Sequence, residues 1–347
     1  MNTIIPKVTV LMSVYNGSTY LEAAIESILN QTFSEFEFLI IDDGSTDESL
    51  SILQHYARID PRIRLICNNQ NKGLTKSLNI GLKQARGRYI ARQDADDISL
   101  PTRLEKQIAF LDTNTTFGLV GCNIAIIDAN GAVSRISKRS TDAYTIRWRL
   151  YFHNEYGAHS ALTLRTKFVR QLQGYAEEYR YAQDYELWTR MSRHSQLGRL
   201  PEVLVLWRAH NQQISSAHKT YQDELAFEIA NAHLQTVFQS PVPSLSIQQA
   251  IYFYRCEFRK IEYPSQLNHI LSKLYTGLKN HRLFPKNARQ ALRRDVAALY
   301  GEYFVRTIYD HQFRYGVMVL FYGVLWHAGA FVSGILEMTR LRISKDA

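Results

Sequence analysis

Between residue 7 and about residue 215, short β-rich runs alternate with helical stretches, and this alternation limits the chain to few folds. Runs and helical stretches follow one another as 8–15, 20–31, 36–42, a helix opened by Ser45 and Thr46, 63–67, 74–84, 89–94 and 101–111. Such an order predicts an α/β fold, a mostly parallel sheet with crossover helices on its faces. Ligands of these sheets bind beyond the carboxyl ends of the strands, so we expect functional residues there.

From about residue 219 the pattern changes to helices with few strand signals, interrupted by Pro241, Pro243, Pro264 and Pro285. The sequence therefore predicts two parts, an α/β domain at 1–218 and a helical region at 219–347. The helical region has 16 Lys and Arg against 10 Asp and Glu, which is +6 of the formal +9 of the whole chain.

A net charge of +9 suits an anionic partner, which could be nucleic acid, a phosphorylated small molecule or an acidic lipid surface. No RRM, zinc or helix-turn-helix pattern accompanies the charge, so we expect no nucleic-acid partner. Three cysteines without a C-x-x-C pair indicate neither a disulfide framework nor a zinc cluster. Residues 1–7 lack the regions of a secretory signal, so a cytoplasmic location is expected.

One stretch near the C-terminus, 315–336, contains no Lys, Arg, Asp or Glu and is long enough to span a bilayer at about 1.5 Å per residue. His327 lies at its centre, and both flanks are basic, which gives no clear crossing direction. Three interpretations stay open: a peripheral or monotopic anchor at the inner leaflet, a true span, and a buried helix or oligomer interface. The basic flanks favour the anchor, because a helix lying in the membrane surface satisfies both.

Polar residues follow the first two predicted strands. The first ends at Ser13-Val14-Tyr15-Asn16-Gly17 rather than at G-x-G-x-x-G, which argues against NAD or FAD. Tyr15 can stack on a nucleobase or can pack at the sheet edge. The second strand ends at Asp42-Asp43, and since neighbouring side chains point to opposite faces, only one carboxylate can accept a base N–H in the crevice.

The fourth strand is followed by Arg92-Gln93-Asp94-Ala95-Asp96-Asp97. In an extended chain Asp94 and Asp96 share a face, where two carboxylates repel unless a cation lies between them. Oxygen ligands suit Mg²⁺ or Mn²⁺, and a diphosphate is the natural co-ligand. The alternative is a solvated acidic turn, which would need no metal.

Two later segments carry further candidate residues. Asp184 precedes Leu187, Trp188 and Met191 at helical spacing, so it can act as a general base at a helix mouth or can cap the helix. Arg208 and His210 follow the strand-like 203–206, and a diphosphate and metal site could use both side chains.

Taken together, these motifs resemble family 2 glycosyltransferases of the GT-A fold over about 6–216. The matching segments are VTVLMSVYNGSTYLEAAIESILNQTFSEFEFLIIDDGSTD, NKGLTKSLNIGLKQARGRYIARQDADD, AHSALTLRTKFV, QDYELWTRM and WRAHNQQIS. The resemblance implies a GT-A nucleotide-sugar-binding domain and a bacterial transferase of surface-polysaccharide assembly, such as O-antigen or capsule. A polyprenyl-linked or glycan acceptor and the cytoplasmic face of the inner membrane follow from the same resemblance.

The resemblance also implies residue roles at the donor end. Ser13 and Tyr15 look like the nucleoside pocket, Asp43 like the acceptor for the base, and Lys76 like a donor-contacting cation. Asp94 looks like the member of the D-x-D pair nearer the ribose.

At the reacting end, Asp96 looks like the direct metal ligand, and His210 resembles a histidine that assists metal or diphosphate binding. Asp184 looks like the catalytic base of an inverting transfer from a nucleotide-diphosphate sugar, with UDP the expected nucleotide. Many relatives have Glu where this chain has Gln183, which puts in doubt an acidic contact to the acceptor but not the base.

Two other functions stay open from the sequence. A nucleotidyltransferase would show a Gly-rich phosphate loop near the first strand, where this chain has only Gly17. A non-catalytic, membrane-bound nucleotide-sugar binder would not need both Asp96 and Asp184. Donor hydrolysis with product analysis separates the binder from the transferase.

Overall fold

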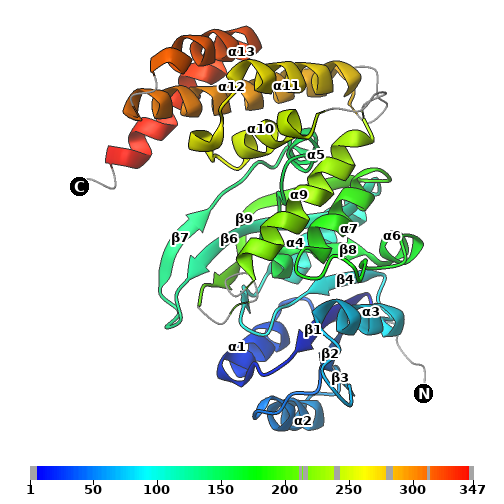
Figure 1. Ribbon diagram of the computed structural model, residues 1–347. Coiled ribbons are helices and arrows are strands. Elements are labelled where there is room, and N and C mark those ends of the chain that lie inside the picture. Colours follow the sequence, from blue (N-terminus) through cyan, green and yellow to red (C-terminus); the bar gives the residue numbers. More distant parts are fainter. Residues whose placement is uncertain are drawn as a thin grey trace. The chain divides into compact units, whose positions relative to one another are not determined.

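The computed structural model describes residues 6–210, 213, 218–237, 243–278, 284–310 and 313–343 (Figure 1). The chain divides into two compact units, one made of 1–143 and 156–223 and the other of 144–155 and 224–347. Residues 144–155 therefore pack with the helical unit although they lie between two parts of the sheet unit in sequence.

The first unit is built on a mixed sheet with the strand order β3-β2-β1-β4-β8-β6-β9-β5, and β7 pairs with β6. Four neighbouring strands are parallel: β1 (Val8–Val14), β2 (Phe36–Asp42), β3 (Ile63–Cys67) and β4 (Tyr89–Arg92). β1 and β2 are buried almost throughout, which is why they read as continuous apolar runs. Val14 pairs with Asp42, so the carboxyl ends of these two strands lie level.

The remaining strands extend the sheet with both parallel and antiparallel pairs. They are β5 (Ile98–Ser99), β6 (Phe117–Ile127), β7 (Val133–Ser137), β8 (Thr163–Arg165) and β9 (Gln196–Arg208). β8 is antiparallel to β4 and to β6, whereas β9 is parallel to β6. The predicted parallel sheet with crossover helices is present, and these strands make it mixed.

Helices connect and cover the strands. They are α1 (Ser18–Leu29), α2 (Ser49–Ile59), α3 (Leu74–Gln84), α4 (Arg103–Thr113), α5 (Ala143–Arg149), α6 (Thr166–Gln171) and α7 (Gln183–Ser192), with a 3₁₀ turn η1 at His159–Ala161. α1 buries Leu21, Ala24, Ile25 and Ile28, the helical spacing that places one face on the sheet. α2 begins at Ser49 and not at Ser45 or Thr46 as the sequence predicts, because residues 45 and 46 bond instead to the turn after β1.

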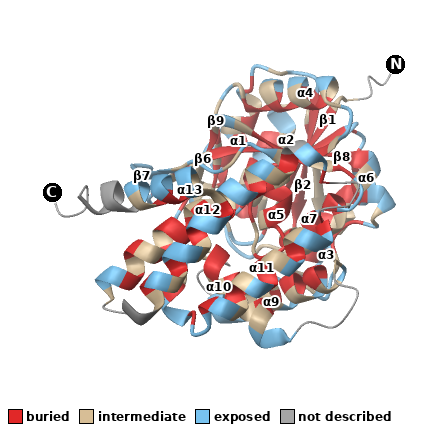
Figure 2. Ribbon diagram, turned by 90° about the horizontal axis from the view of Figure 1, so that it is seen from above, coloured by how far each residue is buried: buried red, intermediate tan, exposed pale blue. Residues whose placement is uncertain are grey.

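The second unit is helical. Its elements are α9 (Lys219–Gln235), which begins in the first unit, α10 (Ser244–Tyr254), η2 (Phe258–Lys260), α11 (Pro264–Leu278), α12 (Lys286–Tyr309) and α13 (Phe313–Ile343). Segment 144–155 is fixed there by an ion pair between Arg149 and Asp295, 2.6 Å long, and by a hydrogen bond from the Trp148 indole to the Tyr254 hydroxyl. α11 has buried residues along one side and exposed residues along the other, whereas α12 is exposed only near its two ends (Figure 2).

α13 contains a break. His327 has extended backbone (φ −172°, ψ 104°) within an otherwise helical run. Tyr315–Glu337 is long and apolar enough to cross a membrane, with a mean hydropathy of 1.7 in its most apolar window, and only 28% of that window is buried. This segment is the single candidate of its kind among the described residues.

Candidate active site

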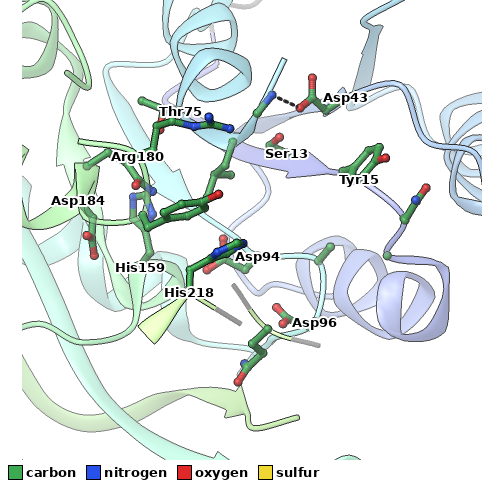
Figure 3. A pocket seen from close by; sticks show the side chains of 18 of the residues that line it. Ser13, Tyr15, Asp43, Thr75, Asp94, Asp96, His159, Arg180, Asp184 and His218 are labelled. Atoms are coloured by element: carbon green, nitrogen blue, oxygen red, sulfur yellow. Dashed lines mark hydrogen bonds between the residues drawn. The ribbon is translucent and has the colours of Figure 1, made fainter. Parts of the chain in front are cut away.

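A cavity of about 850 Å³ opens at the carboxyl edge of the parallel strands. Eight of the nine site residues predicted from the sequence line it: Ser13, Tyr15, Asp43, Lys76, Asp94, Asp96, Asp184 and His210. The ninth, Arg208, does not. In Figure 3, Tyr15 and Asp43 lie on one side of the cavity, Asp184 and His159 on the opposite side, and Asp94 between them.

Asp43 is the carboxylate of the second strand end that lines the cavity. It is buried, and its two oxygens accept hydrogen bonds from the side chain of Asn68 (2.7 Å) and from the backbone N–H groups of Lys72 (3.0 Å) and Gly73 (2.8 Å). Asp42 points elsewhere and accepts from the Ser45 N–H at 3.3 Å. Asp43 therefore lines the cavity, whereas Asp42 braces the turn that follows β2.

Asp94 is held by the side chain of a buried arginine, Arg92. The Arg92 guanidinium is fully buried and donates to an Asp94 carboxylate oxygen and to the carbonyls of Leu11 and Gln93. Burial raises the pKa of Asp94 although the Arg92 charge opposes this, and the Asp96 carboxylate raises it further. Asp94 is therefore a fixed acceptor with one oxygen already committed to protein.

Asp96 contacts His210 in the cavity. The His210 Nε2 atom lies 3.0 Å from Asp96 Oδ2, and the imidazole packs against the Tyr20 ring at a centroid distance of 5.2 Å. These residues come from the turn after β4 and from the end of β9, 114 positions apart in the sequence. The fold therefore brings together the two side chains that the sequence predicts as metal ligands.

Arg208 holds the turn that carries Asp96 and does not line the cavity. Its guanidinium donates to the carbonyls of Asp96 (3.0 Å), Asp128 and Ala129 (3.2 Å each) and lies over the Tyr20 ring at 4.4 Å. This placement favours support of the acidic turn over contact with a ligand. Its predicted contact with a donor stays a prediction.

Asp97 completes the acidic turn and is not among the site residues that the sequence predicts. It is 1% exposed, and its carboxylate accepts from the Arg208 backbone N–H (2.9 Å) and from the Ser160 hydroxyl. Burial raises the pKa of Asp97 well above its usual range, and Asp96 and Asp94 add to this. The only signal in the sequence is a third acidic residue in the same run, and its partners lie 63 and 111 residues away.

The donor set at Asp96 and His210 fits a small divalent cation that is shared with a ligand. Oδ2 and Nε2 are hydrogen-bonded at 3.0 Å, and the same separation suits adjacent ligands on an octahedral ion with metal–ligand distances of about 2.1 Å. Within the described residues, no three His, Cys, Asp or Glu side chains gather as a complete metal site. The protein would therefore supply two ligands, and phosphate oxygens and water would supply the others.

Asp184 lies in the first turn of α7, on the opposite wall. Leu187, Trp188 and Met191 are fully buried on the same helix and fix its orientation. Its neighbour Gln183 also lines the cavity, is 4% exposed, and has no hydrogen-bond partner for Oε1 among the described residues. In the sequence Gln183 stands out only as a departure from a family pattern, and nothing local predicts its burial.

His159 and Arg180 lie near Asp184 in Figure 3 and were not predicted from the sequence. His159 Nε2 is 2.8 Å from the Tyr175 hydroxyl, and burial lowers the pKa of His159 well below its usual range. Arg180 is exposed and lies over the Tyr181 ring at 5.8 Å. His159 belongs to the matching segment AHSALTLRTKFV, which could have pointed to it, whereas Arg180 lies in none of the matching segments, so only the fold places Arg180 at the cavity.

Comparison with known proteins places this site in a family. Residues 9–172 match the model of the family described as glycosyl transferase family 2. An uncharacterized glycosyltransferase of Haemophilus influenzae is 33% identical over 237 residues, which cover 66% of this chain and 73% of that protein. The O-antigen biosynthesis glycosyltransferase WbnJ of Escherichia coli is 30% identical, over 65% of this chain and 89% of WbnJ.

Solved structures share the fold at low sequence identity. S. aureus TarS in complex with UDP-GlcNAc superposes with a TM-score of 0.58 at 18% identity, over 84% of this chain and 86% of that chain. The mannosyltransferase PcManGT of Pyrobaculum calidifontis in complex with GDP-Man and Mn²⁺ has a TM-score of 0.53 at 16% identity, over 97% and 88%. The predicted fold class is confirmed, and the chain belongs to glycosyl transferase family 2.

Proposed function

We propose that the chain is an inverting glycosyltransferase that moves a sugar from a nucleotide-diphosphate sugar to a hydroxyl of a glycan or lipid-linked acceptor. One observation carries this proposal: Asp43, Asp96 and Asp184, which come from distant parts of the sequence, line a single cavity. A base-binding acceptor, a metal ligand and a general base are the three carboxylates that such a transfer requires.

A UDP-sugar is the proposed donor. Tyr15 and Asp43 would hold the nucleoside at one end of the cavity, and the two carboxylates of the D-x-D pair lie toward the centre. The complex of TarS with UDP-GlcNAc supports UDP as the first nucleotide to test. The name of WbnJ, an O-antigen biosynthesis glycosyltransferase, supports a role in surface-polysaccharide synthesis. The cytoplasmic face of a membrane is the proposed place of this reaction.

The proposed chemistry is one in-line displacement at the anomeric carbon. Asp184 accepts the proton of the acceptor hydroxyl while the new C–O bond forms, and the bond to the diphosphate breaks on the opposite face of the sugar. Asp96 and His210 would hold a Mn²⁺ or Mg²⁺, which supplies neutralisation of the charge on the departing diphosphate. A single base without a carboxylate nucleophile gives inversion, by the logic that separates inverting from retaining glycosidases.

The test is a panel of nucleotide sugars scored by calorimetry with and without Mn²⁺, followed by turnover on lipid-linked and soluble glycan acceptors. We expect one donor to bind more tightly with Mn²⁺ and the product to have the opposite anomeric configuration by NMR. Retained configuration would overturn the inverting mechanism, and full activity in excess chelator would overturn the metal. Donor binding without hydrolysis or transfer on any acceptor would favour a non-catalytic binder.

A further inference from the structure

The break in α13 lies at the middle of the apolar stretch and is tied to two arginines of α12. The Arg293 guanidinium donates to the Leu325 carbonyl at 2.9 Å, and Arg294 Nε lies 3.4 Å from His327 Nε2. His327 Nδ1 accepts from the Ala330 N–H at 3.2 Å, so the ring caps the helix that resumes after the break. The Leu325 carbonyl and the Ala330 N–H, on either side of the break, are thus bonded by protein side chains.

The two arginines are exposed cations beside the break. Arg293 and Arg294 are exposed, and among the described residues neither forms an ion pair with a carboxylate. The whole region from residue 219 onward has a formal charge of +6. An anionic surface next to the break would therefore complement the charge of this unit.

Apolar side chains are exposed on both sides of the break. On α13 the exposed apolar residues, here called the α13 face, are Val317 (73%), Leu320 (40%), Phe321 (59%), Val324 (48%), Leu325 (55%), Val332 (53%) and Leu336 (52%). Within each half the spacing is three or four residues, which places Val317, Phe321 and Val324 along one side of the first half and Val332 and Leu336 along one side of the second. The opposite side of the second half packs on α12, where Gly301 and Gly334 allow the two helices to approach closely.

The break limits the ways in which the α13 face can contact a bilayer. The uninterrupted apolar runs are 315–326 and 328–336, about 18 Å and 14 Å long at 1.5 Å per residue, and neither spans a hydrocarbon core of about 30 Å. A transmembrane arrangement would also place Arg293, Arg294 and non-helical backbone near the bilayer centre, which is costly. A helix lying in the surface keeps both arginines in the headgroup layer.

We propose that the α13 face is a docking surface for an anionic lipid bilayer, that it lies in the plane of the membrane, and that Arg293 and Arg294 bind headgroup phosphates beside the break. This proposal rests on the proposed function only in placing the enzyme at a membrane. The apolar residues enter the acyl boundary of one leaflet, and the charged break stays at its surface.

The first experiment is sedimentation of the full chain with vesicles of phosphatidylethanolamine and phosphatidylglycerol, compared with vesicles of phosphatidylcholine. We expect binding to the anionic vesicles only. The triple variant Val317→Asn, Phe321→Asn, Leu325→Asn should weaken this binding by about a hundredfold, because three side chains lose their transfer into the acyl layer.

A matched control removes equally exposed apolar residues elsewhere. Ile59 (62%), Val133 (58%) and Ile136 (54%) lie in the sheet unit, and changing all three to Asn should leave vesicle binding unchanged. Equal loss in both triple variants would overturn the assignment of the surface to α13.

The charge arm uses Arg293→Gln with Arg294→Gln. We expect about a fivefold loss of affinity for anionic vesicles for each arginine removed, and the loss should disappear at high salt. The double variant Arg58→Gln, Lys83→Gln removes two exposed cations of the sheet unit and should bind as the parent does. Unchanged binding of the Arg293→Gln, Arg294→Gln variant would overturn the role of the arginines.

The orientation arm uses single cysteines in a background where Cys67 and Cys256, the two exposed cysteines, are replaced by Ser. On vesicles, Val317→Cys should become protected from a water-soluble maleimide, whereas Ala328→Cys, exposed beside the break, should keep its rate. Equal protection of both positions would indicate a span and overturn the in-plane arrangement.

Transfer to a soluble acceptor is measured on every variant, so that the two proposals fail separately. We expect transfer by the α13 and α12 variants to match the parent. Intact transfer by a parent protein that does not bind vesicles would refute only the docking surface.

Light scattering tests the alternative that a second copy of this chain covers the α13 face. A parent dimer that the α13 triple variant converts to a monomer, without any vesicle binding, would overturn the lipid assignment.

Discussion

The two ends of the cavity are built differently. At the donor end, the turns after β1 and β2 are hydrogen-bonded to each other. Asn16 N–H donates to Ser45 Oγ (3.1 Å), and Thr46 N–H donates to Asn16 Oδ1 (2.8 Å). At the opposite end, Arg180 is exposed, and Tyr181 has a left-handed backbone (φ 67°) and stacks on His218 at 4.2 Å.

The donor end is therefore preorganised, whereas the opposite end is built to adapt. A donor end fixed by buried carboxylates and backbone bonds has little left to order when a nucleotide binds. Exposed side chains at the opposite end, such as Arg180, can adjust to a different acceptor without disturbing the sheet. Variants at the donor and metal end should therefore alter stability or metal binding, and variants at the acceptor wall should alter turnover alone.

The largest effect is expected at Asp184. Asp184→Asn keeps the size of the side chain and removes its ability to take a proton, so kcat should fall by about 10²- to 10⁴-fold. Donor affinity by calorimetry should stay near the parent value, because the base acts mainly in the transition state. Glu177→Gln is the control, since Glu177 is an exposed carboxylate lining the same cavity. Near-normal turnover of Asp184→Asn would place the base elsewhere.

The second effect tests whether the metal end is preorganised by Asp97. Asp97→Ala leaves the Arg208 N–H and the Ser160 hydroxyl without their acceptor, so the separation of Asp96 and His210 is no longer fixed. Loss of such a supporting residue weakens metal affinity by about 10- to 100-fold. The measurement is a Mn²⁺ titration by EPR in the presence of UDP, without any turnover.

Asp97→Asn is the matched control for this prediction, because its amide oxygen can still accept from the Arg208 N–H. We expect it to recover most of the Mn²⁺ affinity. A lower melting temperature of Asp97→Ala with unchanged Mn²⁺ affinity would show that Asp97 acts on stability alone.

A smaller effect is expected at Gln183, on the acceptor wall. Its Oε1 is buried at the cavity without a partner among the described residues, so an acceptor hydroxyl would satisfy it. Gln183→Leu should lower kcat/KM for the acceptor by about 3- to 10-fold, the value of one neutral hydrogen bond, while donor affinity is unchanged. Gln183→Glu, which keeps the acceptor atom, should lose less. Equal loss of donor affinity in Gln183→Leu would contradict the division between the two ends.

The sequence predicts the parallel half of the sheet and the residues at its strand ends, because both signals are local. The strands at 36–42 and 63–67 and the helix at 74–84 occur with the predicted bounds. The support beneath the site depends on long-range contacts, such as Asp97 with Ser160 and with Arg208, that no local pattern encodes. The break at His327 is equally hidden, because no proline marks it and its partners lie on α12.

The smallest effect concerns Asp47, which joins the two turns of the donor end. Its carboxylate accepts from the Ser49 N–H (2.9 Å) at the start of α2 and from the Ser18 N–H (3.1 Å) at the start of α1. Partial burial raises the pKa of Asp47, but the hydrogen bonds from Ser49 and Ser18 outweigh it and lower the pKa to about 2.

Asp47→Ala should therefore lower the free energy of unfolding by about 1 kcal/mol at neutral pH, the usual value of a helix cap. A folded pKa below the unfolded value of 3.8 means that this stability is present above pH 3.8 and is lost as the pH falls through about 2. Urea unfolding of parent and variant should thus converge over that range. Glu48→Ala is the control, because Glu48 stands at the N-cap of α2 without a side-chain bond to it. A constant difference from pH 7 to pH 2 would show that the carboxylate charge at Asp47 contributes nothing to the donor end.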